Sequence, residues 1–300
     1  MHPKLIALEN QFARSILTKV SDLCLDRRQV ELWVKRDDLL HPILSGNKWR
    51  KLKYILNHAL SLGATKVVSM GGAYSNHLHA LAYVGQWLGL QTEAFVRGEP
   101  QSNPTLNDME QWGMRLQFVS REDYRNLRQH KHWKSLPGID TNAYWLPEGG
   151  SVELALQGVA ELISEIDLQY DVICCPCGTG TTLAGIIEAV RSDVRVIGFS
   201  ALKGGEFLKL DVEALLTRSR DNWDIITGYH FGGFARTSTE LFEFMECFSS
   251  QSSIQLEPVY TGKMLYGIYD LLEKGFFKPG QRIIVLHSGG LQGNRGFLAK

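Results

Sequence analysis

The stretch "YDVICCPCGTGTTLAG", residues 170–185, decides the fold class of this chain. It begins with an apolar, β-branched run typical of a buried strand. "CGTGTTLAG" (177–185) then turns through glycines and threonines into the start of a helix. A strand, a glycine-rich loop and a helix in this order make half of a βα unit, in which strands pair in parallel. This segment therefore predicts an α/β protein.

The same alternation recurs along the chain and predicts further strands. We expect them within residues 30–38, 64–70, 92–98, 142–150, 193–201 and 281–290. Residues 100–140 are polar and rich in Arg, Gln and His, which indicates a surface excursion. Repeated βα units predict parallel sheets, and we expect two α/β lobes with a cleft between them.

The bulk composition excludes several classes of protein. Lys plus Arg and Asp plus Glu both number 32 among 300 residues, so no net charge favours nucleic acid or a membrane surface. The N-terminus lacks an apolar signal region, and no run reaches the roughly 18 residues of a membrane span. The five cysteines include "CCPC" (174–177), which is neither a disulfide framework nor a zinc spacing. We expect a cytoplasmic protein with reduced thiols.

Three loops after predicted strands carry polar groups, namely Gly71–His77, Gly178–Thr182 and Ser288–Gly290. Ligands bind beyond the carboxyl ends of parallel strands, so we expect these loops to share one cleft. Amide and hydroxyl donors at a helix start make Gly178–Thr182 suitable for a monophosphate. It is not a P-loop, and Leu183 replaces the third glycine of the dinucleotide fingerprint, which disfavours a nicotinamide dehydrogenase. A tight turn without a ligand is the simpler alternative.

The segment "GGAYSNHLHA" (71–80) places Ser75, Asn76 and His77 near another helix start. Their donors suit a carboxylate or a phenolate oxygen, although N-capping alone would explain a Ser or Asn there. His77 and His79 diverge on a helix and lack an acidic third ligand, so we expect no metal site. The absence of a GxSxG elbow around Ser75 argues against a hydrolase.

One lysine in "SGNKWRKLK" (45–53) is distinguished by its direction. On a helical wheel, Lys48 falls within the apolar arc of Trp49 and Leu52. Arg50 points the opposite way, and the other two lysines lie at the borders of the arc, where their stems can reach solvent. Desolvation and the helix N-terminus would lower the pKa of Lys48, so a neutral amine could form a Schiff base. The alternative is that Lys48 curls to the surface at a frayed first turn.

Five segments occur together in the order found in one family. They are "VKRDDLL…SGNKWRKLKY", "GGAYSNHLHALA", "CGTGTTLAG", "EPVYTGK" and "LHSGGLQG". From about Val34 to Gly293 the chain resembles the fold-type II pyridoxal 5'-phosphate enzymes, in the branch of 1-aminocyclopropane-1-carboxylate deaminase and D-cysteine desulfhydrase. This resemblance implies a two-lobed, three-layer α/β/α fold similar to the tryptophan synthase β chain. It also implies a homodimer, with a larger cofactor lobe (1–50 and 156–300) and a smaller inserted lobe (51–155).

The resemblance also implies roles for individual residues. Lys48 would bind the cofactor aldehyde and later act as the base at the substrate's α-carbon. The cofactor phosphate would be held by Gly178, Thr179, Gly180, Thr181 and Thr182. Asn76 would hydrogen-bond the phenolate oxygen, Ser75 and His77 would receive the substrate carboxylate, and Tyr260, after a short expected strand, would lie over the ring as a proton donor or acceptor.

Two departures from the deaminase pattern bear on the substrate. Thr261 stands where the deaminases carry a carboxylate opposite the pyridine nitrogen, and either Thr261 or Ser288 would offer a neutral hydroxyl instead. A weaker electron sink favours elimination of a good leaving group over opening of a cyclopropane. The deaminases' second tyrosine aligns with Phe231, with Tyr229 two residues away.

The leading hypothesis is therefore α,β-elimination from D-cysteine, or a related small D-amino acid, to pyruvate, ammonia and sulfide. The alternatives are a 1-aminocyclopropane-1-carboxylate deaminase that forms α-ketobutyrate and ammonia, and a D-serine dehydratase-like enzyme. A different class also remains open, a non-catalytic protein that binds the cofactor or a phosphorylated metabolite.

Overall fold

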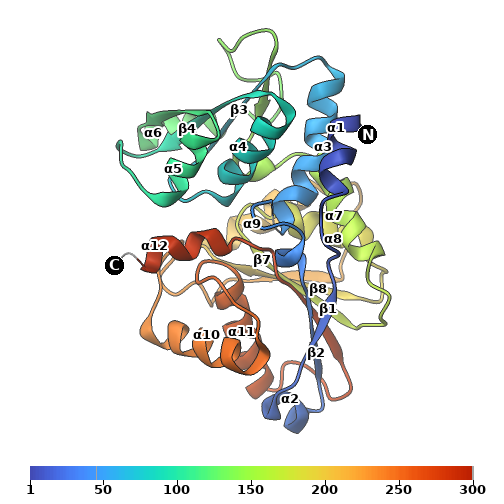
Figure 1. Ribbon diagram of the computed structural model, residues 1–300. Helices are drawn as coiled ribbons and strands as arrows, with labels where there is room; N and C mark the ends of the chain where they lie inside the picture. The colour runs from blue at the N-terminus through green and yellow to red at the C-terminus, as the bar shows by residue number, and fades with distance from the viewer. Residues whose placement is uncertain (45, 299–300) are drawn as a thin grey trace.

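The larger of two sheets forms the base of the molecule in the computed structural model, which describes residues 1–44 and 46–298 (Figure 1). Its strands run in the order β1-β2-β10-β7-β8-β9. Their bounds are β1 Leu17–Val20, β2 Glu31–Lys35, β7 Val172–Cys177, β8 Arg195–Ser200, β9 Trp223–Ile226 and β10 Arg282–Leu286. All pairs are parallel except β1 with β2. The segment 170–185 therefore contributes the central strand β7, as its apolar composition predicts.

The second sheet has four parallel strands in the order β5-β4-β3-β6. Their bounds are β3 Lys66–Gly72, β4 Gln91–Arg97, β5 Met114–Val119 and β6 Ala143–Leu146. All four lie inside residues 51–155, the segment expected to form the smaller lobe. In Figure 1 this sheet lies above the larger one.

Helices cover both faces of each sheet, which confirms the three-layer α/β/α fold. One face of the larger sheet packs against α2 (Leu23–Arg28), α10 (Thr239–Ser252) and α11 (Thr261–Glu273), and the other against α7 (Leu154–Ser164), α8 (Thr181–Ala189) and α9 (Leu208–Glu213). The smaller sheet packs against α1 (Pro3–Glu9), α3 (Asn47–Ser61), α4 (Asn76–Leu88) and α5 (Pro104–Gln111) on one face and α6 (Arg121–Leu127) on the other. Short 3-10 turns span Asp37–Leu39, Glu148–Gly150, Gly205–Phe207 and Leu291–Asn294 (η1 to η4), and α12 spans Arg295–Leu298.

Seven of the strands expected from the sequence are present in the described residues, and three more are found there. Region 100–140 is not merely a surface excursion, because it contains α5, β5 and α6. The edge strand β5 has only one fully buried side chain, which is why its sequence reads as polar. The strands β1 and β9 are four-residue edge strands with equally weak patterns. The prediction of a short strand before Tyr260 is wrong, because the described chain at 253–260 forms no strand.

Helix α3 lies where the two lobes meet. It packs on α4 of the smaller lobe and on α7 of the larger one, so little of its surface faces water. Helix α1 lies beside it (Figure 1) and buries Leu5 and Leu8 in the core of the smaller lobe, although residues 1–50 were expected to belong to the larger one. Cys174, Cys175 and Cys177 are buried free thiols of β7, as expected. Within the described residues, no helix is both long and apolar enough to cross a membrane.

Candidate active site

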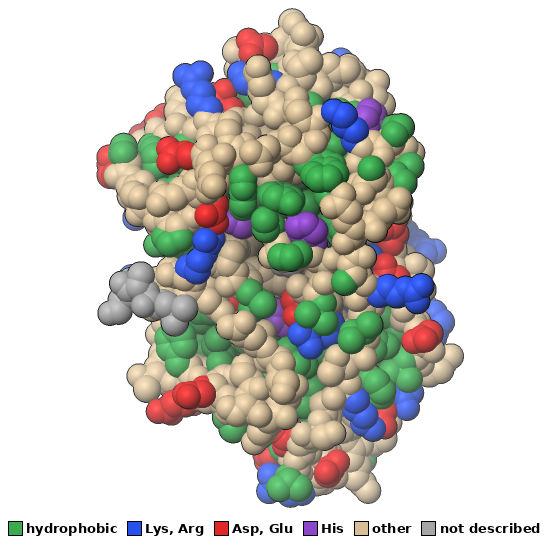
Figure 2. Space-filling model, in the orientation of Figure 1, with side chains coloured by type: hydrophobic (Ala, Val, Ile, Leu, Met, Phe, Trp, Pro, Cys, Tyr) green, Lys and Arg blue, Asp and Glu red, His purple; other side chains and the backbone are tan. Residues whose placement is uncertain are grey.

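A cavity of about 560 Å³ lies where the carboxyl ends of the two sheets face each other. This volume is in the range that binds a cofactor or small metabolite. Figure 2 shows hydrophobic and histidine side chains gathered in the hollow between the lobes. Its lining includes Lys48, Ser75, Asn76, His77, Gly178, Thr179, Gly180, Thr181, Thr182, Tyr260 and Ser288, all selected from the sequence. Thr261 lies outside this lining, fully buried beneath it.

Lys48 occupies the first turn of α3 and faces the cavity, where its side chain stays partly accessible. Burial among protein atoms lowers the pKa of its amine to about 8, and the nearby Glu257 carboxylate opposes this shift. At pH 7 about a tenth of the amine is therefore unprotonated, far more than for an exposed lysine. An amine in this state can attack an aldehyde.

The prediction that the other three basic side chains of α3 point to solvent or reach it is wrong. Arg50, Lys51 and Lys53 are all buried, with 4%, 3% and 8% of their surfaces exposed. A helical wheel assumes that one side of the helix faces water, but α7 covers that side. Lys48 is therefore not the one inward-facing cation of this helix.

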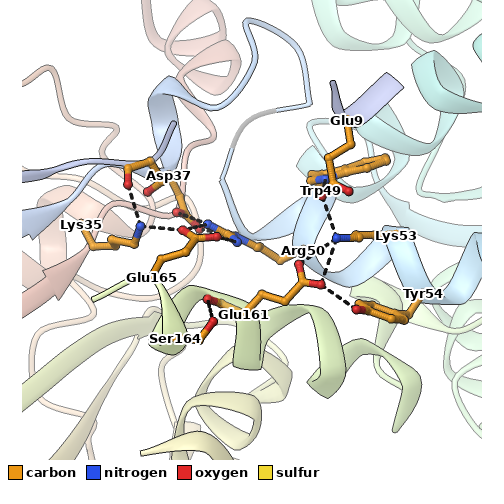
Figure 3. A network of polar contacts seen from close by, with 11 residues as sticks. Glu9, Lys35, Asp37, Trp49, Arg50, Lys53, Tyr54, Glu161, Ser164 and Glu165 are labelled. Carbon is orange, nitrogen blue, oxygen red and sulfur yellow. Dashed lines mark hydrogen bonds and ion pairs between the residues drawn. The ribbon is translucent and has the colours of Figure 1, made fainter. Parts of the chain in front are cut away.

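Arg50 and Lys53 are neutralised by carboxylates (Figure 3). Arg50 donates to Asp37 Oδ1 at 3.0 Å and to both oxygens of Glu165, which also accepts from Lys35 Nζ at 2.7 Å. Lys53 Nζ lies 2.9 Å from Glu161 Oε2 and 2.7 Å from Glu9 Oε1.

Lys51 is a functional candidate that the sequence reasoning missed. Its amine lines the cavity and donates to Gly149 O at 3.0 Å. Burial, reinforced by the charge of Lys48, places its pKa well below the usual range. A Cβ on Gly149 would lie 2.9 Å from Thr179, so Lys51 lies beside the glycine–threonine loop. The spacing of two lysines at positions i and i+3, on one helix face, was the available signal.

The glycine–threonine loop joins β7 to α8. Gly180 has φ +74° and caps α8 without a side-chain bond, so the first amides of the helix stay open to a ligand. Thr179 and Thr181 hydroxyls lie 3.0 Å apart, and Asn47 Nδ2 donates to Thr182 Oγ1 at 2.9 Å. Open amides, hydroxyls and the helix dipole together suit a phosphate group.

A second helix start faces the same cavity. Ser75 caps α4 by accepting from Leu78 N at 3.2 Å, so N-capping does account for this serine. The cap leaves the amides of Asn76 and His77 for a ligand. Two open amides at the N-terminus of a 13-residue helix suit a carboxylate.

His77 lines the cavity, and its hydrogen bonds determine which ring nitrogen carries the proton. Ser69 Oγ donates its one proton to Leu146 O at 2.8 Å, so it accepts from His77 Nε2 at 2.9 Å. This leaves Nδ1 unprotonated, buried and without a partner among the described residues. Burial, and then the charges of Lys48 and Lys51, lower the pKa of His77 well below 6.5. The neutral ring is therefore unsuited to binding a carboxylate through Nδ1.

Glu257 is a second residue that the sequence reasoning missed. Its carboxylate lines the cavity and accepts from the amides of Val259, Tyr260 and Thr261 at 2.6–2.9 Å and from Thr261 Oγ1 at 3.1 Å. The hydroxyl of Thr261 is therefore engaged with Glu257, while Ser288 lines the cavity. Burial raises the pKa of Glu257 and also that of Tyr260, whose phenol stays protonated.

Neither candidate for the second tyrosine reaches the cavity. Tyr229 donates its hydroxyl to Asp270 Oδ2 at 2.5 Å, and Phe231 packs on the ring of Tyr266. From the segment 228–236 the cavity receives Phe234 and Ala235. The Phe234 ring lies 5.9 Å from that of Tyr260. This wall therefore carries an aromatic ring without a hydroxyl.

Comparison with known proteins agrees with this geometry. Residues 17–289 match the family described as pyridoxal-phosphate dependent enzyme. The chain belongs to this family. A mitochondrial bifunctional D-cysteine desulfhydrase/1-aminocyclopropane-1-carboxylate deaminase of Arabidopsis thaliana is 30% identical over 88% of this chain and 73% of its own length. A 1-aminocyclopropane-1-carboxylate deaminase of Bradyrhizobium sp. is 27% identical over 90% of this chain and 89% of its own.

Solved structures show the same fold. A homologue of 1-aminocyclopropane-1-carboxylate deaminase superposes with a TM-score of 0.81 at 26% identity, covering 100% of this chain and 98% of its own. A fungal L-serine ammonia-lyase from Rhizomucor miehei superposes with a TM-score of 0.69 at 17% identity, covering 96% and 98%. The chain is thus a fold-type II pyridoxal-phosphate-dependent enzyme, and a purely cofactor-binding protein is disfavoured.

The residues of the cavity fit pyridoxal phosphate. They supply an amine whose pKa is about 8 for the aldehyde and a helix start with three threonines for the phosphate. A third feature, the buried lone pair of His77 Nδ1, has no partner among the described residues and indicates that a ligand donor or water completes this wall.

Proposed function

We propose that this chain catalyses the α,β-elimination of D-cysteine, or a related small D-amino acid, with water to pyruvate, ammonia and sulfide. The observation that carries the proposal is the wall beside Tyr260, where Phe234 offers no phenol and Tyr229 is committed to Asp270. The resemblance to the deaminases implies a second active-site tyrosine, and ring opening would need its phenol. The name of the bifunctional Arabidopsis relative includes D-cysteine desulfhydrase beside the deaminase activity, so D-cysteine is a substrate within this group of relatives.

The residues of this chain would share the work as follows. When bound, pyridoxal phosphate withdraws electrons from the α-carbon of the attached amino acid. Lys48 Nζ accepts the α-proton, because its lowered pKa leaves it neutral often enough to act as a base. The open amides of α4 and the Ser75 side chain orient the carboxylate, and the protonated phenol of Tyr260 donates a proton near the leaving group.

The remaining residues would hold the cofactor. Gly178–Thr182 and Lys51 surround the phosphate, and Asn76 donates to the phenolate oxygen. Ser288, rather than Thr261, would hold the pyridine nitrogen, because Ser288 lines the cavity and the Thr261 hydroxyl is already bound to Glu257. A neutral hydroxyl there leaves the ring a moderate electron sink, which suffices when the carbanion charge departs with sulfide.

Deamination of 1-aminocyclopropane-1-carboxylate is the second candidate, and Glu257 favours it. A carboxylate beside the ring nitrogen would keep it protonated and strengthen the electron withdrawal that ring opening requires. Glu257 lines the cavity, but four hydrogen bonds already engage it.

A substrate panel distinguishes the two candidates. The purified enzyme is given D-cysteine, L-cysteine, D-serine and 1-aminocyclopropane-1-carboxylate, and the keto acid, ammonia and sulfide are measured. We expect kcat/KM for D-cysteine to exceed that for the cyclopropane by about tenfold or more. In that case Glu257→Gln, which keeps an acceptor for the amides, retains most of the activity.

A different outcome of the substrate panel would favour the deaminase. α-Ketobutyrate formation that rivals sulfide release, and that is lost in Glu257→Gln, would establish the deaminase instead. Tyr229→Phe is the matched control, because its hydroxyl is bound to Asp270 outside the cavity, and it should leave either activity unchanged.

A further inference from the structure

A segment after β10 crosses the cavity and contacts the smaller lobe. It comprises η4 and α12, and its residues Gly293, Gly296 and Phe297 line the cavity. Two side chains of this segment, Gln292 and Arg295, reach across to α4 and α5. Neither residue was selected from the sequence.

The contacts of Gln292 determine how its amide is oriented. Its Oε1 lies 3.3 Å from Arg295 Nη2 and accepts from Thr105 Oγ1 at 2.7 Å. An arginine has no acceptor, so the atom facing it must be the amide oxygen. The amide nitrogen of Gln292 then points to Asn76 and donates to Asn76 Oδ1 at 2.5 Å.

Orientation of Asn76 follows from this bond. Because Gln292 occupies Oδ1, the amide nitrogen of Asn76 must lie on the other side. A Cβ built on Gly290 would come within 2.7 Å of Asn76 Nδ2, so this nitrogen lies against a glycine that lines the cavity. Gly290 also has φ +87°, which side chains rarely adopt. The donor end of Asn76 therefore faces the cavity.

We propose that Gln292 is a positioning residue that makes Asn76 a donor toward the phenolate oxygen of the cofactor. This inference rests on the assignment of Asn76 made under the proposed function. Arg295, held by Asp108 Oδ2 at 2.6 Å, fixes the polarity of Gln292. Asp108 of the smaller lobe thus acts on Asn76, at the start of α4 in the same lobe, through Arg295 and Gln292 of the segment after β10. A reversed Asn76 would present an oxygen to an anionic oxygen.

Two variants test this chain of polarity. Gln292→Met keeps the size but removes the donor, so Asn76 can rotate. Gln292→Glu still accepts from Thr105 and Arg295, yet it can only accept from Asn76, which must then turn its nitrogen away from the cavity. We expect pyridoxal phosphate to dissociate about ten- to a hundredfold more readily from Gln292→Glu, with Gln292→Met intermediate. Titration of the cofactor-free protein, followed by absorbance, measures this.

Thermal unfolding of the cofactor-free protein separates polarity from stability. Gln292→Glu gains an ion pair with Arg295, so its Tm should equal or exceed that of the wild type while its cofactor affinity falls. The absorption maximum of the bound cofactor should also move, since the phenolate oxygen loses a donor. Glu31→Gln is the control, because it weakens the ion pairs with Lys19 and Arg282 outside the cavity; it is expected to lower Tm but to change the dissociation constant by less than about twofold.

If the wild type and Gln292→Glu bind pyridoxal phosphate with equal affinity, the inference is overturned. It is also overturned if each variant loses affinity only in proportion to its loss of Tm. Because the readout is cofactor binding, either result is independent of which amino acid proves to be the substrate.

Discussion

The two sides of α3 carry the same kinds of side chain with opposite electrostatics. On the cavity side, burial lowers the pKa of Lys48 to about 8 and places that of Lys51 well below its usual range. On the α7 side, burial also opposes the charge of Lys53, but hydrogen bonds to Glu9 and Glu161 outweigh it and raise the pKa. Arg50 is likewise paired, with Asp37 and Glu165.

The difference teaches that burial alone does not define a reactive lysine. What separates the two sides is whether the fold supplies a carboxylate within hydrogen-bond reach. The α7 side places Glu161 and Glu165 there, whereas among the described residues the amine of Lys51 has only the carbonyl oxygen of Gly149. The cavity side therefore keeps amines that no carboxylate of the described chain occupies and that can donate hydrogen bonds to an anionic ligand.

Removal of the Lys48 amine should have the largest effect. We expect Lys48→Ala to lower turnover by about a thousandfold or more, because the same amine binds the cofactor and moves the α-proton. Stopped-flow absorbance measures capture of pyridoxal phosphate by the cofactor-free protein. In the wild type this rate should rise about tenfold per pH unit up to about pH 8, because only the neutral amine attacks and protonation removes it below the pKa.

The variant should lack this pH dependence while keeping the circular dichroism spectrum of the wild type. A variant that captures the cofactor at the wild-type rate would show that another amine, such as that of Lys51, reacts.

Removal of a paired carboxylate should affect stability rather than chemistry. Asp37→Ala leaves the buried Arg50 without its buried partner, so that only the more exposed Glu165 remains, and we expect it to lower the free energy of unfolding by about 3 kcal/mol. Urea denaturation of the cofactor-free protein measures this.

A suitable control is Asp193→Ala, which breaks the exposed ion pair with Arg191 and should leave the unfolding midpoint nearly unchanged. Equal midpoints for both variants would mean that the Arg50 cluster contributes no more than a surface pair.

The smallest effects should come from a matched pair of lysines two positions apart. Lys51→Met should weaken pyridoxal phosphate binding about tenfold and leave the cofactor-free protein equally stable or more so, because a desolvated charge is removed. Lys53→Met should do the reverse and lower stability by about 1 kcal/mol without changing affinity. Cofactor titration and urea denaturation of both variants test this; if both lose affinity to the same extent, the two sides are not functionally distinct.

The sequence predicted the fold better than it predicted the environment of charged side chains. Strand–loop–helix order located the central strands, because β7 is apolar throughout and β10 is apolar after Arg282. The edge strand β5 was not predicted, because one of its faces is in contact with water and carries polar residues. Convergence of the three loops also followed from parallel topology, since carboxyl ends share one edge.

The parts of the site that the sequence did not predict depend on contacts between distant segments. A helical wheel cannot show that α7 covers Arg50, whose partner Glu165 is 115 positions away. The same applies to Gln292, which meets Asn76 across 216 positions. Glu257 accepts from the amide of Thr261, the first residue of α11. In the sequence it therefore resembles an ordinary helix-capping residue, although its carboxylate also lines the cavity.

Residues 3–9 and 291–298 both fasten onto the smaller lobe. Leu5 and Leu8 fill its core, Lys4 Nζ donates to Leu88 O at 2.8 Å, and Arg295 bonds Asp108. An excised fragment 51–155 would consequently expose the hydrophobic surface that Leu5 and Leu8 of α1 cover in the full chain. Chimeras grafted between relatives would have to transplant α1 together with the insertion.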